Sequence, residues 1–339
     1  MPLLFLLLLV LATGCSKSEQ LHVYCWSEYF NPEVIEKFEE TYHCNVIVDT
    51  FDSNESMFAK LSLGGPSYDL VVPSNYFLDL MDAHGMLQPI DKSLLPNLQH
   101  LDPQYERFFD PRFSAYGIPY SVTYAGIAYR QDKVPHIAHS WGIFSHTELR
   151  GRMTMLNDLR EVFGAALKYH GYSANTVNKD EIAQATETLL QWKKNLTRFE
   201  GEQYRNGIAS AEYFVVQGQS GDIFQVMREN ASVAFFVPKE GSMVSGDYFV
   251  VPKGAKNVSL AHAFINFFYE PEHAAKNMAF NGYICPNRAA YALLPEHLKR
   301  NRVLFPPAEW MENSELIRYV GPATQLYNEA WDRVKSSTR

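Results

Sequence analysis

The sequence contains little cysteine, with four among 339 residues: Cys15, Cys25, Cys44 and Cys285. Cys25 is expected to end one strand and Cys44 to begin the next. In a parallel pair they would lie on the order of 13 Å apart at about 3.3 Å per residue, which is too far for a disulfide. The pairs His22/Cys25 and His43/Cys44 have odd separations, so their members lie on opposite faces of a strand and argue against a metal site. No metal and no cofactor are predicted.

Recognisable catalytic motifs are also absent from the sequence. Residues 218–221 (Gly-Gln-Ser-Gly) lack the spacing of a nucleophile elbow, and there is no phosphate-binding glycine-rich loop or zinc-type His-Glu-x-x-His segment. Asp158 and Glu161 are three residues apart, so on a helix they share one face and could form a hydrolase pair. Paired carboxylates beside a helix start are more often caps or solvated acids. We therefore predict that the protein is not an enzyme, with a carboxylate-pair hydrolase as an open alternative.

Long runs of charge of either sign are missing. The formal net charge of −8 is spread along the chain, which argues against nucleic acid as a partner and is compatible with a mild affinity for cations. With 46% hydrophobic residues, the chain can bury a sizeable core. Its length is long for one domain and comfortable for two.

One apolar run, residues 2–12, is too short to span a bilayer, and no other segment resembles a membrane span. The run ends in small residues before Cys15, so residues 1–14 resemble a bacterial lipoprotein signal peptide. Two features depart from that pattern, because no Lys or Arg precedes the run and Ala12 stands where Leu is commoner. We expect Cys15 to be the lipidated mature terminus, with residues 15–20 as a tether and the lipid as the only membrane contact.

Beyond the leader, strand and helix patterns alternate, which predicts an α/β fold with a parallel sheet. Asn31 and Pro32 are typical of a helix start, as a cap and a first-turn proline. The Gly- and aromatic-rich residues 116–129 are expected to carry the chain from one domain to the other. Strands are expected at residues 45–48, 68–72, 233–237 and 247–252, and helices at 32–42, 57–63, 162–169, 181–193 and 259–269.

Two expected strands end in side chains suited to a ligand. The first strand runs into residues 26–29 (Trp-Ser-Glu-Tyr), and a later strand runs into Ser74 and Tyr76. In open α/β sheets, ligands bind beyond the carboxyl ends of the strands. These loops therefore predict the rim of a ligand cleft, while the alternative is that Trp26 and Tyr29 only fix their loop to the core.

Several short segments follow an order shared with a known family. They are residues 24–29, 53–57, 68–74, 91–93, 101–103, 160–163, 238–241 and 282–283. By these segments the chain resembles the substrate-binding lipoproteins of polyamine ABC transporters, the spermidine/putrescine-binding family. The resemblance implies a two-domain, hinged periplasmic-binding-protein fold of type II with an interdomain ligand cleft. It places residues 21–122 and 246–294 in the first α/β domain and residues 123–245 and 295–339 in the second.

The resemblance also implies a set of ligand-binding residues. Carboxylates at intervals would bind the ammonium groups of a polyamine, while aromatic faces would cover its methylenes and add cation–π attraction. The matching positions are Trp26, Ser27, Glu28 and Tyr29 in the first loop, Ser74 and Tyr76 in the second, the acids Asp158, Glu161 and Asp247, and Tyr283.

Two positions depart from the family's aromatic box. Gln219 and Ser245 stand where relatives usually place tryptophan, and a late cleft glutamine is not evident near Ile317. Phe214, Tyr248 or Phe249 are possible substitutes for the lost aromatic faces. The cleft is therefore expected to be wider, to bind more weakly or to prefer a different amine.

The sequence thus predicts a monomeric, lipid-anchored receptor on the periplasmic side of the cell membrane or on the cell surface. It would capture a small polyamine, such as putrescine or spermidine, and deliver it to an ABC permease. One alternative keeps the fold and binds another cationic or amino-acid-like solute. Another is a sensor or adhesion lipoprotein without a role in transport.

Overall fold

The structure is a computed structural model that describes residues 18–64 and 67–338. The predicted signal peptide and Cys15, the predicted lipidation site, lie outside the described residues. The strands are β1 (Glu19–Trp26), β2 (Cys44–Phe51), β3 (Leu70–Val71), β4 (Gly117–Arg130), β5 (Met153–Leu156), β6 (Leu196–Glu200), β7 (Val215–Gln219), β8 (Val233–Phe236), β9 (Met243–Val250) and β10 (Glu315–Leu316). The α-helices are α1 (Pro32–Tyr42), α2 (Asn54–Ser62), α3 (Asn75–Ala83), α4 (Leu159–Tyr169), α5 (Lys179–Lys193), α6 (Tyr204–Ala209), α7 (Ser220–Glu229), α8 (Val258–Phe268), α9 (Pro271–Asn281), α10 (Arg288–Tyr291), α11 (Glu296–Lys299), α12 (Ala308–Met311) and α13 (Thr324–Ser336).

One mixed sheet runs through the molecule in the order β2-β1-β3-β9-β4-β7-β5-β6, with β10 beside β9 and β8 beside β4. Its two ends are parallel, because β1 pairs in parallel with β2 and β3, and β5 pairs in parallel with β6 and β7. The long strands β4 and β9 join these ends as an antiparallel pair. The fold is therefore of the predicted α/β class.

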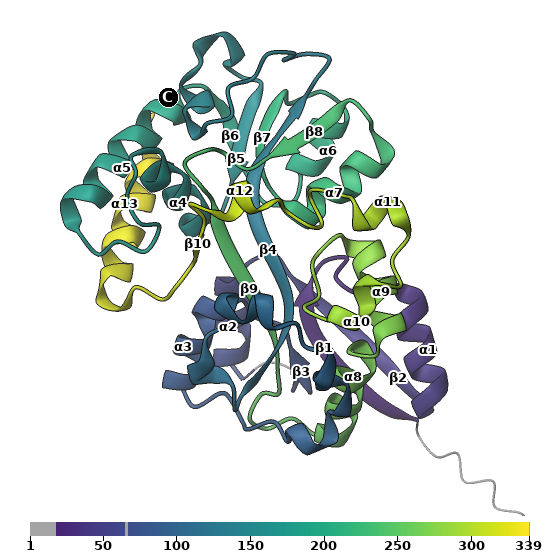
Figure 1. The fold of residues 1–339 in the computed structure, drawn as a ribbon. Coiled ribbons are helices and arrows are strands. Elements are labelled where there is room, and N and C mark those ends of the chain that lie inside the picture. The colour runs from purple at the N-terminus through teal and green to yellow at the C-terminus, as the bar shows by residue number, and fades with distance from the viewer. Residues whose placement is uncertain (1–17, 65–66, 339) are drawn as a thin grey trace, which may run out of the picture.

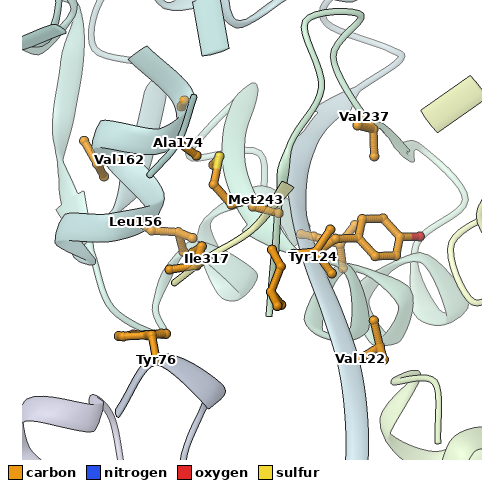
Figure 2. Packing of buried hydrophobic residues seen from close by; sticks show 14 of the residues in the cluster. Tyr76, Val122, Tyr124, Leu156, Val162, Ala174, Val237, Met243 and Ile317 are labelled. Carbon is orange, nitrogen blue, oxygen red and sulfur yellow. The ribbon is translucent and has the colours of Figure 1, made fainter. Parts of the chain in front are cut away.

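Figure 1 shows that β4 and β9 connect two lobes. The lower lobe contains β1–β3 with α1–α3 and α8–α10, and the upper lobe contains β5–β8 with α4–α7 and α13. One apolar cluster lies within the lower lobe and includes Phe38, Phe249 and Phe264. A second cluster joins both lobes, and Figure 2 shows two of its members, Tyr76 on α3 and Leu156 at the end of β5, on facing sides. The lobes therefore share part of their core.

The predicted domain boundaries fall within the two connecting strands. Val122 pairs with Gly246 and Thr123 with Ser245, so the boundary expected after residue 122 and the one expected after residue 245 lie opposite each other in the ladder. Residues 117–130 form one continuous strand, β4, which carries the chain from one lobe to the other. The start of the returning strand was predicted wrongly, because the strand expected from residue 247 begins at residue 243. The domain limits themselves stay a prediction.

Local signals placed most early elements correctly. Helix α1 spans the predicted residues, and the Asn31 side chain accepts a hydrogen bond from the backbone N–H of Glu33 at 2.8 Å. Helix α2 begins three residues earlier than expected because the hydroxyl of Ser53 caps it, accepting from the backbone N–H of Ser56 at 3.2 Å. The strand expected at residues 68–72 is reduced to the pair Leu70–Val71.

The cysteines lie as expected from the parallel pairing. Cys44 stands opposite Glu19 and Cys25 opposite Thr50, so the two thiols lie at opposite ends of the β1–β2 ladder. Together with Cys285 they are free and buried. Among the helices of residues 18–64 and 67–338, none is long and apolar enough to cross a membrane.

Candidate functional site

A cavity of about 150 Å³ lies where the two lobes meet. It has room for on the order of ten water molecules, at roughly 15 Å³ each. Loops that follow β1, β2 and β3 in the lower lobe and β5, β6 and β7 in the upper lobe line it, together with the middle of β4 and β9. Eleven of the twelve residues singled out from the sequence are in this lining: Trp26, Ser27, Tyr29, Ser74, Tyr76, Asp158, Glu161, Gln219, Ser245, Asp247 and Tyr283.

The loop after β1 is held from behind by the backbone carbonyl of Tyr29. That oxygen accepts hydrogen bonds from the Tyr120 hydroxyl at 3.1 Å and from the Asn281 amide at 2.9 Å. The Tyr29 ring is buried and its hydroxyl donates to Asp247. Tyr29 therefore both anchors the loop and contributes to the cavity, so the two interpretations weighed from the sequence apply together.

Asp247 on β9 is a buried carboxylate surrounded by hydroxyl groups. It is 3% exposed and accepts hydrogen bonds from Ser74 at 2.7 Å, from Ser121 at 3.2 Å and from Tyr29. Burial raises its pKa to about 6, although these hydrogen bonds act in the opposite direction. Among the described residues, none forms an ion pair with Asp247. The site offers negative charge without a protein cation to balance it.

A pair of acidic residues, Asp158 and Glu161, lies at the start of α4 in the upper lobe. Asp158 caps the helix, and one of its oxygens accepts from the backbone N–H groups of Arg160 at 2.8 Å and Glu161 at 3.0 Å. Glu161 is 4% exposed, and within the described part of the chain its Oε2 atom has no hydrogen-bond partner. Burial, and next the charge of Asp158, raise the pKa of Glu161 to about 8. A buried carboxylate oxygen without a partner is costly, and a bound donor would remove that cost.

Gln219 orients this glutamate from the end of β7. Its Nε2 atom donates to Oε1 of Glu161 at 3.0 Å, while its Oε1 atom accepts from the Thr123 hydroxyl at 3.1 Å. Ser245 is 5% exposed and pairs with Thr123 across the β4–β9 ladder. At the first of the two positions, the structure therefore holds an amide that fixes a carboxylate instead of a broad aromatic face.

None of the three aromatic side chains considered as possible substitutes lines the cavity, and all three pack elsewhere. Phe214 faces the Arg152 guanidinium, with 5.2 Å from its centre to the ring centroid. Tyr248 packs edge-on against Phe109, and the Phe249 ring lies in the lower-lobe core. Tyr248 and Phe249 are buried in apolar clusters, and Phe214, just before β7, packs partly buried against one of them, so none of the three faces the cavity.

Sequence reasoning missed a cavity-lining group on α6 and α7. Tyr204 is 2% exposed, and its hydroxyl donates to Asp222, which also accepts from the Tyr283 hydroxyl at 2.8 Å. Next to them, Arg205 lies 3.9 Å from Asp222 and donates to Glu28 at 2.8 Å. No sequence motif marks these three residues. They reach the cavity only because α6 and α7 begin beside it in the folded chain.

Of the ten residues that the resemblance implies for ligand binding, Glu28 alone is outside the cavity lining. It adopts a left-handed backbone with φ of 51° at the turn after β1. Its carboxylate is 54% exposed and binds Arg205. Glu28 therefore pairs with a protein cation at the rim, where we had expected it to face a ligand.

The cavity is strongly acidic. Arg205 is the only basic residue among the described residues that line it. One of the acids, Glu200, is already paired with Arg198. The seven lining acids are Asp52, Asp158, Glu161, Glu200, Glu202, Asp222 and Asp247. Such a balance favours a cationic ligand over an anionic one.

Comparison with known proteins agrees with this arrangement. The family model of bacterial extracellular solute-binding proteins matches residues 33–306. The chain belongs to this family.

Three similar proteins show how much of the chain the likeness covers. The chain is 34% identical over 328 residues to the spermidine/putrescine-binding periplasmic protein of Escherichia coli K12, which covers 96% of this chain and 94% of that protein. It is 32% identical over 353 residues to the putrescine-binding periplasmic protein PotF of the same organism, with 97% and 95% covered. The solved structure of the TpPotD lipoprotein of Treponema pallidum is 38% identical, with a TM-score of 0.85, and the match covers 94% of this chain and 100% of that one. The resemblance stated from the sequence and the type II fold are thus confirmed.

Proposed function

We propose that the protein is a receptor that captures a small polyamine in this cavity and releases it to an ABC permease, without chemical turnover. One observation carries the proposal. Buried acids from both lobes, Asp247 below and Asp158 with Glu161 above, line the same cavity, and no basic residue of the described chain forms an ion pair with any of them.

Two ammonium groups joined by methylenes would satisfy this arrangement. One ammonium would replace the missing cation at Asp247, and the other would donate to the free Oε2 of Glu161 and to Asp158. The rings of Trp26, Tyr76 and Tyr204 in the lining would cover the methylenes. Hydrogen bonds to charged groups contribute about 1.5–3 kcal/mol each, so the two ends would supply most of the affinity.

Binding would also favour lobe closure. A ligand that reaches acids of both lobes makes all its contacts only when the lobes are together, so it stabilises the closed state by that difference in contacts. The β4–β9 pair, which carries both predicted domain boundaries, would serve as the hinge.

The cellular setting is part of the proposal. Two of the relatives are named periplasmic proteins and a third is named a lipoprotein, which supports a periplasmic location with a lipid anchor at Cys15. We propose that the receptor acts as a monomer, that its lipid is its only membrane contact and that it does not bind nucleic acid.

A second candidate ligand is a basic amino acid or a similar solute. Arg205 in the cavity lining favours it, because a guanidinium could bind a ligand carboxylate. However, Glu28 already accepts from this guanidinium at 2.8 Å and Asp222 lies 3.9 Å away, so a carboxylate would have to displace an acid of the protein.

Calorimetry on refolded, ligand-free protein tests the proposal. Titration with 1,4-diaminobutane, spermidine and arginine should give saturable binding of at least one of the two polyamines, with arginine weaker. Binding of arginine alone would support the second candidate, and no binding of any amine would overturn the proposed function.

A further inference from the structure

Arg205 forms the centre of a charged cluster at one end of the cavity. Arg205 is the second residue of α6, and its side chain is 19% exposed. Its guanidinium donates to Glu28 of the lower lobe at 2.8 Å and lies 3.9 Å from Asp222 and 3.9 Å from Glu202 of the upper lobe. Three acids thus surround one fixed cation.

This cluster adjoins the proposed ligand-binding acids through tyrosines. The Tyr283 hydroxyl donates to Asp222 at 2.8 Å, and the Tyr283 ring lies 5.4 Å from the ring of Tyr29, which donates to Asp247. Asp222, Glu202 and Arg205 all line the same cavity as Asp247. The cluster therefore lies where a ligand that extends beyond the first acids would go.

Charge decides what this end of the cavity accepts. Although burial acts to lower it, the nearby Asp222 and Glu28 hold the pKa of Arg205 above its ordinary value, so the guanidinium stays charged. The guanidinium already neutralises the carboxylates to which a further ligand ammonium would bind. Its positive charge also repels that ammonium. A ligand with two ammonium groups avoids this end, whereas one with three would bring a positive charge to it.

We propose that Arg205 is a specificity-determining residue that replaces the third ammonium of a longer polyamine and so makes the receptor select diamines over triamines. The inference rests on the proposed function, and it goes further by naming the ligand's charge count. It assigns Glu28 and Glu202, which no ligand need touch, the task of holding Arg205 in place.

The test compares two substitutions that break the same ion pair from opposite sides. Arg205→Met keeps the apolar stem and removes the positive charge, leaving Glu28, Glu202 and Asp222 available to an ammonium. Glu28→Gln removes one of the negative charges that balance the Arg205 guanidinium, so the guanidinium should repel a ligand ammonium more strongly. Calorimetry with 1,4-diaminobutane and spermidine on the wild type and both variants gives the ratio of the two affinities.

We expect Arg205→Met to shift this ratio toward spermidine by at least tenfold, and Glu28→Gln to shift it toward the diamine. Arg205→Lys keeps the charge, serves as the control and should leave the ratio within threefold of the wild type. If the methionine variant fails to fold, Arg205→Gln removes the same charge and takes its place. A purely structural latch between the lobes would weaken both ligands alike in both variants, and equal ratios would overturn the inference while the proposed function stands. If the wild type binds neither amine, both the proposed function and this inference fail.

Discussion

Replacing Asp247 by asparagine should weaken ligand binding and at the same time stabilise the empty protein. The Oδ1 atom of the carboxylate accepts from Ser74 at 2.7 Å, and its Oδ2 atom accepts from Ser121 at 3.2 Å. An asparagine oxygen can accept on one of these sides, while its amide N–H donates to a hydroxyl oxygen on the other. What disappears is the charge that an ammonium would pair with. At about 1.5–3 kcal/mol for a hydrogen bond to a charged group, and about 1.4 kcal/mol per tenfold, the diamine affinity should fall by roughly 10- to 150-fold.

The stabilising effect follows from the pKa of the same group. Burial raises the pKa of Asp247 from 3.8 to about 6 in the folded protein. Because the folded-state pKa exceeds the unfolded one, stability falls as pH rises from about 4 to about 6, and the whole penalty is present at pH 7. At about 1.36 kcal/mol per pKa unit, the penalty is on the order of 3 kcal/mol. Asp247→Asn should recover part of it and raise Tm by a few degrees at pH 7.

Calorimetric titration and thermal unfolding of the ligand-free variant measure both effects. At pH 4, where Asp247 is mostly protonated in the folded state, the gain in Tm should shrink. Asp82→Asn, which changes an exposed acid on α3, serves as the matched control and should alter neither quantity. An affinity within threefold of the wild type would refute the role of Asp247 as a ligand contact. A lower Tm would refute the view that its charge is uncompensated.

Three further predictions concern other residues. Because the pKa of Glu161 is raised to about 8 in the empty protein and a bound ammonium favours the carboxylate, diamine affinity should fall by up to about tenfold per pH unit below pH 8, and calorimetry in buffers of different ionisation enthalpy should detect proton release. A pH-independent affinity between pH 6 and 8 would contradict this. Ser245→Trp should abolish diamine binding, since an indole would fill most of a cavity of about 150 Å³; tighter binding would show that the cavity opens to accept it. Cys15→Ala should lose fatty-acid labelling in cells, and unchanged labelling would exclude Cys15 as the lipidation site.

Sequence signals with a local physical cause predicted the fold well. The Asn31-Pro32 pair fixed the start of α1, because capping and a preset φ depend only on neighbouring residues. The strand character of residues 117–130 was missed because glycine usually marks turns or bulges, whereas here Gly117 and Gly126 lie in a strand that the two lobes cover along most of its length. Only the pairing with β9 and β7 reveals that cover.

The site was predicted where the ligand chemistry is concentrated in one loop or helix start. Trp26 and Tyr29 follow the first expected strand, so the α/β rule predicted their place at the cavity that they line. The family resemblance, and not this rule, pointed to Asp158 and Glu161, which also line the cavity. Arg205 could not be found in this way. Its position depends on α6 being folded back against β7, and its pairing with Glu28 joins residues 177 positions apart.

The most direct test of the account compares two ligands of equal length that differ by one charge, 1,4-diaminobutane and pentylamine. The central claim is that acids of the two lobes each bind one ammonium group. Pentylamine keeps the four methylenes, carries a methyl group in place of the second ammonium and can pair with only one of the two acid sites. Its affinity should therefore be at least about tenfold lower, from the loss of one charge-assisted contact of roughly 1.5–3 kcal/mol. Affinities that agree within threefold in calorimetry would contradict two-ended recognition and with it the proposed binding mode.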